Sequence, residues 1–189
     1  MKFSRELCPS YEHEKIYAGK AFNLSMGEAF MIEGKLLYCS IELERRVASL
    51  YLELASVVEG KDKFASIFLK QIGLESSFHS EILRSLSMAL GAYEETGDCP
   101  AVIGEAWRRV EEAYSKIKQG KVAEAESVLK DLVLLEGFAS EETYHKLLLP
   151  LISKLLQDEA PVDLAKLSIE KIIQDEAFHE KALKKMAEI

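Results

Sequence analysis

Apolar residues recur at steps of three and four in four long stretches of the chain, and each stretch predicts an amphipathic helix with one side facing a core. The stretches cover residues 35–59, 61–90, 122–149 and 161–189. Gly60 and Gly91 close the first two, and Asp62 stands near the start of the second. Because only a Gly-Lys-Asp turn joins these two helices, we expect an antiparallel hairpin. No stretch alternates as a strand does, so the sequence predicts an all-α fold.

The segments between these helices carry weaker patterns. Residues 1–34 have no clean period and contain three glycines, which predicts an irregular or partly helical N-terminal arm. Residues 91–100 predict a loop and residues 100–118 a further helix, so the second and third long helices are joined by a long connection. Pro150 is expected to kink or end the third long helix, with about two more helical turns after it. Residues 35–189 should form one domain.

Acidic and imidazole side chains interrupt the apolar side of every long helix, at positions where the spacing calls for another apolar residue. In chain order they are Glu44, Glu75, His79, Glu136, Glu176 and His179. Burying such groups without partners costs several kcal/mol, roughly. A single glutamate in a helix is usually solvated, but six polar groups on four core-facing sides indicate a shared partner inside the core. A metal is the partner that we expect.

The chain also contains an internal repeat. At an offset of 100 residues, Ile72, Glu75, Phe78, His79 and Leu83 align with Ile172, Asp175, Phe178, His179 and Leu183. At an offset of 92, Glu44 aligns with Glu136. Each half would therefore be a helical hairpin with an acid on its first helix and an acid with a histidine on its second. We expect the two hairpins to pack as a four-helix bundle with approximate two-fold symmetry, the long connection serving as a crossover.

Four carboxylates and two imidazoles suit a pair of first-row transition ions, some of the carboxylates bridging and others terminal. Iron is the metal that we expect, with manganese or zinc as substitutes. The core of the bundle would hold two ions close together in a dry, rigid surrounding and leave open positions for dioxygen or peroxide. The sequence therefore predicts a di-iron centre.

These residues resemble the rubrerythrin branch of the ferritin-like di-iron carboxylate proteins. The resemblance covers most of residues 35–189 and rests on the order Glu, acid with His, Glu, Glu-x-x-His over the four helices. Tyr51, seven residues after Glu44, also matches the first helix of that family, and Tyr144 follows Glu136 by eight residues. The resemblance implies an up-down, ferritin-like four-helix bundle whose long crossover carries an extra helix.

The resemblance also implies a role for each residue of the site. It gives Glu44 and Glu136 as terminal or bridging ligands, Glu176 and His179 as ligands of one iron, and Glu75 and His79 as ligands of the other. Tyr51 and Tyr144 would place hydroxyl groups that orient the carboxylates. The implied reaction is a di-iron oxidoreduction that reduces peroxide or oxidises ferrous iron with dioxygen.

The sequence departs from the family pattern in three places. Ser76 stands where the Glu-x-x-His motif would put its glutamate, which leaves Glu75 four residues before His79; that spacing still keeps the two on one side of a helix. Ala139 stands where the family has a further glutamate. No four-cysteine rubredoxin segment is present, so electrons would have to come from a separate electron-donor protein.

Two other functions stay open. A di-iron monooxygenase acting on an organic substrate would need an apolar channel that reaches the irons. A non-catalytic bundle, metal-free or with a structural metal, would act through protein contacts. We expect a homodimer, by resemblance to the family and because the N-terminal arm needs a surface to pack on.

The charge and the cysteine content indicate which partners, which cellular location and which state of the thiols to expect. The net charge of -8 argues against a nucleic-acid or anionic-membrane partner, because affinity for phosphates comes mainly from Lys and Arg. The N-terminus is interrupted by charge, and no apolar run is long enough to be a signal sequence or to span a bilayer, so a cytoplasmic location is expected. Cys8, Cys39 and Cys99 are odd in number and far apart, and we expect reduced thiols.

Overall fold

The computed structural model describes residues 26–93, 95, 97–118, 122–138, 144, 146, 148–155 and 162–187. This part of the chain is helical apart from short connections and contains no strand, which confirms the predicted all-α fold. The helices are α2 (Met26–Val58), α3 (Lys63–Ala89), α4 (Cys99–Ile103), α5 (Glu105–Lys118), α6 (Val122–Phe138), α7 (Leu149–Leu155) and α8 (Val162–Ala187). None of these helices combines the length and the apolar composition that crossing a bilayer requires.

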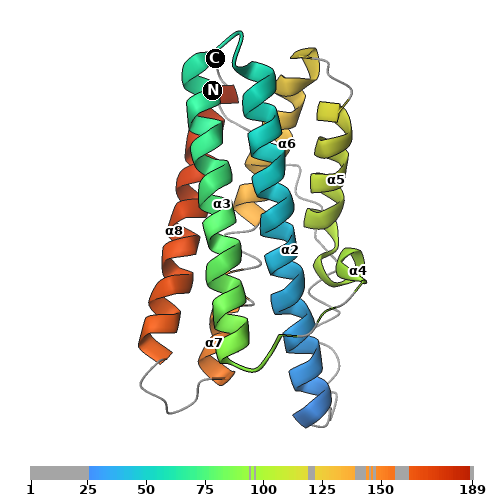
Figure 1. The fold of residues 1–189 in the computed structure, drawn as a ribbon, viewed down its shortest axis with the longest axis vertical. Helices are drawn as coiled ribbons and strands as arrows, with labels where there is room; N and C mark the ends of the chain where they lie inside the picture. The colour runs from blue at the N-terminus through green and yellow to red at the C-terminus, as the bar shows by residue number, and fades with distance from the viewer. Residues whose placement is uncertain are drawn as a thin grey trace, which may run out of the picture.

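The long helices pack side by side as a bundle (Figure 1). The helices α2 and α3 form the hairpin expected from the short turn between them and share the most extensive contact in the fold. The helices α6 and α8 form a second contacting pair, and the pairs meet where α3 lies against α8 and α2 against α6. The shorter α4 and α5 pack against α2, and α5 also contacts α6. The core therefore lies among α2, α3, α6 and α8 and extends to the buried sides of α4, α5 and α7.

Helix α2 begins earlier than predicted, at Met26 rather than near Lys35. It therefore includes the last part of the predicted N-terminal arm; residues 1–25 lie outside the described part. Gly34 sits buried within the helix. Glycine lowers helix stability by about 1 kcal/mol relative to alanine, but packing against a partner helix offsets a cost of that size. A glycine alone is thus a weak stop signal.

The ends of α3 follow the sequence signals. The Oδ1 atom of Asp62 accepts hydrogen bonds from the backbone N–H groups of Phe64 and Ala65, both at 2.9 Å, and so caps the first turn. At the other end, α3 stops at Ala89 and the chain turns at Gly91, whose φ of 62° is the left-handed conformation that glycine adopts most readily. Both predicted boundaries are confirmed.

The crossover and the third long helix are more divided than the periodicity suggested. Gly104 has a φ of 68° and separates α4 from α5, so the single helix predicted over residues 100–118 is two. The predicted helix over residues 122–149 is described as α6 as far as Phe138, and residues 139–143 lie outside the described part. Pro150 lies at the start of α7, directly after residues 144, 146 and 148, which are π-helical, so the chain is helical on both sides of the proline and the helix changes type there.

A disulfide joins Cys39 in α2 to Cys99 at the start of α4, across a sequence separation of 60 residues. The prediction of reduced thiols is therefore wrong for these two residues; Cys8 lies outside the described part. The reason is tertiary: the crossover folds back so that α4 packs on α2, which brings the two Cα atoms within 5.2 Å. Spacing along the sequence carries no sign of that approach. The expected cytoplasmic location stays a prediction.

Removing this disulfide should destabilise the fold. A cross-link over a 60-residue separation restricts the unfolded chain, and its loss is expected to lower the free energy of unfolding by about 2–4 kcal/mol. Urea unfolding of the oxidised protein, compared with the double variant Cys39→Ser, Cys99→Ser, measures the loss. A Cys8→Ser variant, which leaves the pair intact, is the control. Equal free energies of unfolding, together with three free thiols in the denatured wild type, would contradict the disulfide.

Candidate metal centre

Five of the six polar residues predicted to face inward meet in the core of the bundle. They are Glu44 of α2, His79 of α3, Glu136 of α6, and Glu176 and His179 of α8. None of them is more than 4% exposed. The three-four spacing explains this position, because each replaces an apolar residue on the side of its helix that faces the neighbouring helices.

The five side chains form two groups of three that share one member. Ligand atoms of Glu44, His79 and Glu176 all lie within 4.8 Å of one another, and so do ligand atoms of Glu136, Glu176 and His179. The Oε1 atom of Glu176 is 3.0 Å from the Nδ1 atom of His79 and 3.8 Å from that of His179. Such an arrangement fits two neighbouring cations that share the carboxylate of Glu176.

The atoms that point into the site have no hydrogen-bond partner among the described residues. They are Oε2 of Glu44, Oε2 of Glu136, Oε1 of Glu176, and Nδ1 of His79 and of His179. Some of these atoms are close to one another, but they lack the alignment of a hydrogen bond. An unsatisfied buried polar atom costs about 1–3 kcal/mol. Metal ions at this point would satisfy all five atoms together, so the residues present could hold a metal.

The outer nitrogen of each histidine contacts an acid from the opposite helix. The Nε2 atom of His79 lies 3.2 Å from Oδ2 of Asp175, and the Nε2 atom of His179 lies 2.7 Å from Oε2 of Glu75. The two contacts are reciprocal, since α3 and α8 each supply one histidine and one acid. A carboxylate behind an imidazole fixes the orientation of the ring and directs the other nitrogen toward the metal. Both rings thus present Nδ1 to the centre.

Glu75 was predicted as a ligand, but the structure places it outside both groups of three. Its side chain is 35% exposed, and its second oxygen accepts a hydrogen bond from Gln71 at 3.0 Å. One residue further along α3, Ser76 is buried at the position that corresponds to Glu176. Asp175 was not singled out from the sequence as a functional residue. The internal repeat carried the signal, because it aligns Asp175 with Glu75.

Two buried tyrosines hold the outer oxygens of the carboxylates. The hydroxyl of Tyr51 donates to Oε1 of Glu136, and the hydroxyl of Tyr144 donates to Oε1 of Glu44. Each tyrosine therefore binds the glutamate of the other half of the molecule. With Oε1 held from outside, the Oε2 atoms of both glutamates are left facing the centre. A hydroxyl at this position can orient a carboxylate, which is the role that the resemblance implies for both tyrosines and which stays a prediction.

Without metal, burial keeps protons on some of these carboxylates. Desolvation raises the pKa of Glu44 to about 8, against the opposing effect of the Tyr144 hydroxyl. Burial, together with the nearby charge of Glu136, raises the pKa of Glu176 well above its usual range. Burial acts on Glu136 in the same direction, but the close contacts of its carboxylate with Glu176, His179 and Tyr51 outweigh burial and lower its pKa. The site thus holds protons at positions that cations would take.

The pKa values of the two histidines are shifted in opposite directions. Burial lowers the pKa of His79, so its ring favours the neutral form that binds metals. Burial acts the same way on His179, but its contacts with Glu136 and Glu75 outweigh burial and raise the pKa. In the metal-free site, His179 is therefore the imidazole that more readily carries a positive charge.

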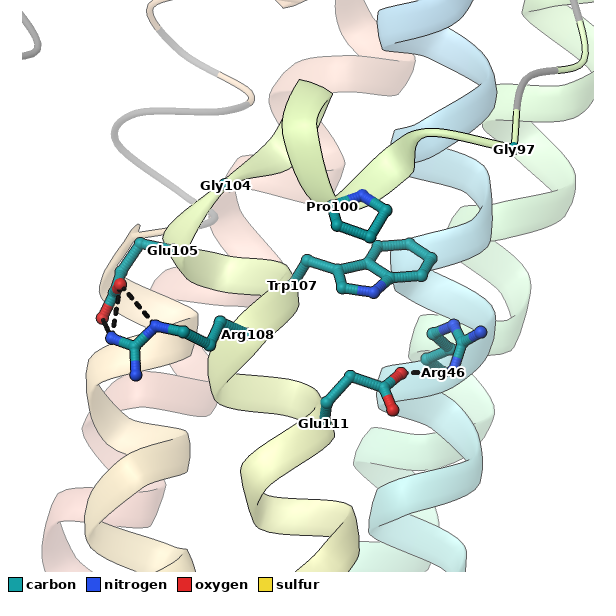
Figure 2. A pocket seen from close by; sticks show the side chains of 8 residues that line it. All are labelled: Arg46, Gly97, Pro100, Gly104, Glu105, Trp107, Arg108 and Glu111. Carbon is teal, nitrogen blue, oxygen red and sulfur yellow. Dashed lines mark hydrogen bonds and ion pairs between the residues drawn. The ribbon is translucent and has the colours of Figure 1, made fainter.

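A separate hollow lies on the surface where α4 and α5 pass α2 (Figure 2). Its volume is about 770 Å³, and it is lined by Arg46, Gly97, Pro100, Gly104, Glu105, Trp107, Arg108 and Glu111. The guanidinium of Arg46 lies 4.5 Å from the centroid of the Trp107 ring and pairs with Glu111. None of the metal-site residues lines this hollow, so the candidate chemistry belongs to the core.

Comparison of the chain with protein-family models, with curated proteins and with solved structures finds no match in any of the three.

Proposed function

We propose that α2, α3, α6 and α8 form a ferritin-like four-helix bundle that holds two iron ions. We further propose that the protein is a di-iron oxidoreductase of the rubrerythrin type, which reduces peroxide or oxidises ferrous iron with dioxygen. The observation that carries the proposal is the convergence of five unpaired ligand atoms, from four helices, at one buried point. A metal-free core would leave those atoms unsatisfied, at a cost that buried polar groups rarely incur.

The ligands divide evenly between two ions. Glu44 and His79 would hold one ion, Glu136 and His179 the other, and Glu176 would belong to both. When bound, two ferrous ions supply two electrons, which with two protons convert one peroxide molecule to two waters. Three carboxylates offset most of the positive charge of the pair, and neutral imidazoles complete the coordination without adding charge.

The protein's own groups prepare the site for that chemistry. Glu44 and Glu176 keep their protons in the metal-free state and must release them when cations bind. Tyr51 and Tyr144 hold the outer carboxylate oxygens in place, and apolar packing of the four helices excludes water. The predicted electron-donor protein and the homodimer stay predictions, as does the choice between peroxide and dioxygen.

Metal loading tests the proposal. Purified protein incubated anaerobically with ferrous iron should bind close to two irons per chain. Addition of peroxide or of dioxygen should then oxidise the iron rapidly, which stopped-flow absorbance follows. Failure to take up iron, manganese or zinc would overturn the proposal and leave a bundle that acts through protein contacts. If the protein binds iron but neither oxidant oxidises it rapidly, the remaining functions are a structural metal site and a monooxygenase that reacts only with its organic substrate bound.

Tyr51→Phe should weaken metal binding without abolishing it. The variant keeps all five ligands but frees Oε1 of Glu136, so that this carboxylate is no longer fixed in orientation. We expect two ions per chain with about 10–100-fold lower affinity. Calorimetric titration with manganese measures the change. The matched control is Tyr114→Phe, which removes a hydroxyl bonded to Glu53 on the outside of the bundle at 2.7 Å and should leave affinity unchanged. Equal affinities in the two variants would contradict the role of Tyr51.

A further inference from the structure

The two halves of the metal centre match residue by residue except at one position. The matched pairs are Glu44 with Glu136, Tyr51 with Tyr144, Glu75 with Asp175, and His79 with His179. The unmatched pair is Ser76 with Glu176. Glu176 is the carboxylate that belongs to both groups of ligands, so its counterpart across the two-fold relation is the place where a second shared carboxylate would stand.

Ser76 is buried and has an unpaired hydroxyl. It lies one turn before His79 on α3, is 1% exposed, and its Oγ atom has no hydrogen-bond partner in the described part of the chain. Ser77 and Ser80, close to it on α3, both donate to backbone carbonyls of the preceding turn. Ser66 and Ser87 of the same helix also have unpaired hydroxyls, but Ser76 is the one that lies a single turn from a histidine of the metal centre. The Ser76 hydroxyl is thus a free donor on the side of α3 that carries the ligand His79.

The exchange of glutamate for serine also changes the charge of the site. Among the described residues, three carboxylates face the centre, so with these alone a pair of divalent ions keeps one positive charge uncompensated, and a pair of trivalent ions keeps more. The side chain of Ser76 is shorter than that of a glutamate, and it offers a hydroxyl that can donate a hydrogen bond in place of a carboxylate that can bind a metal. A small anion would supply what is missing, namely negative charge and an acceptor for the hydroxyl.

We propose that the position beside Ser76, opposite Glu176, is a binding site for one small anionic ligand of the size of peroxide or azide. The inference rests on the proposed function and deepens it, because it assigns the substrate to one side of an otherwise two-fold symmetric centre. With metal bound by the five ligands, the Ser76 hydroxyl would donate a hydrogen bond to an anion that lies on the side of His79. Ser76 is then a substrate-binding residue, and Glu176 closes the opposite side.

Azide titration of the cobalt-loaded protein tests this proposal without relying on turnover. Metal analysis first counts the ions bound, and visible absorbance of cobalt then reports each azide that joins the coordination. We expect one azide for each pair of ions in the wild type. Ser76→Glu should keep both ions and bind azide about 100-fold more weakly, because its own carboxylate takes the position. Ser76→Ala should keep azide binding but weaken it by about 2–13-fold, the loss of one hydrogen bond.

Ser77→Glu is the matched control, since it adds the same side chain to the neighbouring, partly exposed position and should leave the azide affinity unchanged. A wild type that binds no metal overturns the proposed function, and this inference with it, before azide is added. A wild type that binds two ions but no azide, or two azides per pair, overturns this inference alone. So does a metal-loaded Ser76→Glu variant with wild-type azide affinity. Should Ser76→Glu fail to fold, the wild-type stoichiometry and the Ser76→Ala titration still decide.

Discussion

Glu176→Ala is expected to abolish the loading of both metal ions. The Oε1 atom of Glu176 belongs to both groups of ligands, so its removal leaves each ion with one carboxylate and one imidazole. Loss of a buried, charged ligand should cost about 3–5 kcal/mol, which is a factor of roughly 10²–10³·⁵ in affinity at each ion. Metal analysis after equilibrium dialysis measures the loss, and ferrous oxidation should fall to the rate of free iron. No other side chain in the described part of the chain is shared in this way.

Two variants separate the loss of a ligand from general damage to the fold. Glu170→Ala removes an exposed carboxylate from the same helix and should keep two ions per chain. Glu176→Gln keeps the shape of the side chain, so the metal-free protein should stay folded while the rise in melting temperature on adding metal disappears. A Glu176→Ala protein that loads two ions and oxidises ferrous iron as fast as the wild type would refute the shared-ligand role.

Much of this site was predictable because its residues break a pattern that is otherwise strict. A glutamate or histidine in an apolar three-four register is conspicuous, and Glu44, His79, Glu136, Glu176 and His179 all occupy such positions. The helix ends at Asp62 and Gly91 were predictable for a local reason, since capping and left-handed turns depend on one or two residues. These features depend only on short stretches of sequence.

Glu75 shows where the periodic argument stops. Positions on one side of a helix recur every 3.6 residues, so a residue three or four positions before His79 is equally compatible with the inward-facing side. Both Glu75 and Ser76 satisfy that condition, and the chemistry of a carboxylate favoured Glu75 as the ligand. In the structure Ser76 faces inward, and Glu75 lies at the flank, behind the ring of His179. Moving by one residue along a helix rotates the side chain by about 100° around the axis. The spacing of apolar residues cannot tell which of two such neighbours faces inward.

The disulfide shows a second limit, which is long-range contact. Cys39 and Cys99 meet only because α4 packs on α2, and neither cysteine carries a local sign of the other. The pairing of Tyr51 with Glu136, rather than with the glutamate of its own helix, is of the same kind. Such contacts depend on the angle and rotation of whole helices, whereas sequence periodicity defines only which side of each helix faces inward.

Metal affinity should fall steeply as the pH drops from 8 to 6. In the metal-free protein Glu44 has a pKa of about 8, and burial raises the pKa of Glu176 well above its usual range, so lower pH favours the protonated form of both carboxyls. A cation must displace both protons, and each displaced proton weakens binding by about tenfold per pH unit. We therefore expect a loss of affinity of up to about 100-fold per pH unit. Manganese titrations at several pH values, in buffers of different ionisation heat, measure both the affinity and the protons released.

The stability of the metal-free protein should change in the opposite direction. Because the folded pKa of Glu44 is about 8 and its usual value is 4.5, the folded protein holds a proton that the unfolded chain has lost. Its contribution to stability is complete below pH 4.5 and is lost as the pH rises to 8, by about 1.4 kcal/mol per unit. The raised pKa of Glu176 acts in the same sense, whereas the lowered pKa of Glu136 stabilises the fold above pH 4.5 and no longer changes between pH 6 and 8.

Metal-loaded and metal-free proteins should therefore diverge in melting temperature as the pH rises from 6 to 8, because bound metal stabilises the fold in proportion to its affinity. Glu44→Gln removes one of the two protons, so its metal-free stability should depend less on pH. Parallel pH profiles for the loaded and metal-free proteins would mean that cations do not displace protons from the buried carboxyls. Diverging profiles, with proton release on metal binding, would tie the raised pKa values of Glu44, Glu176 and His179 to the metal site itself.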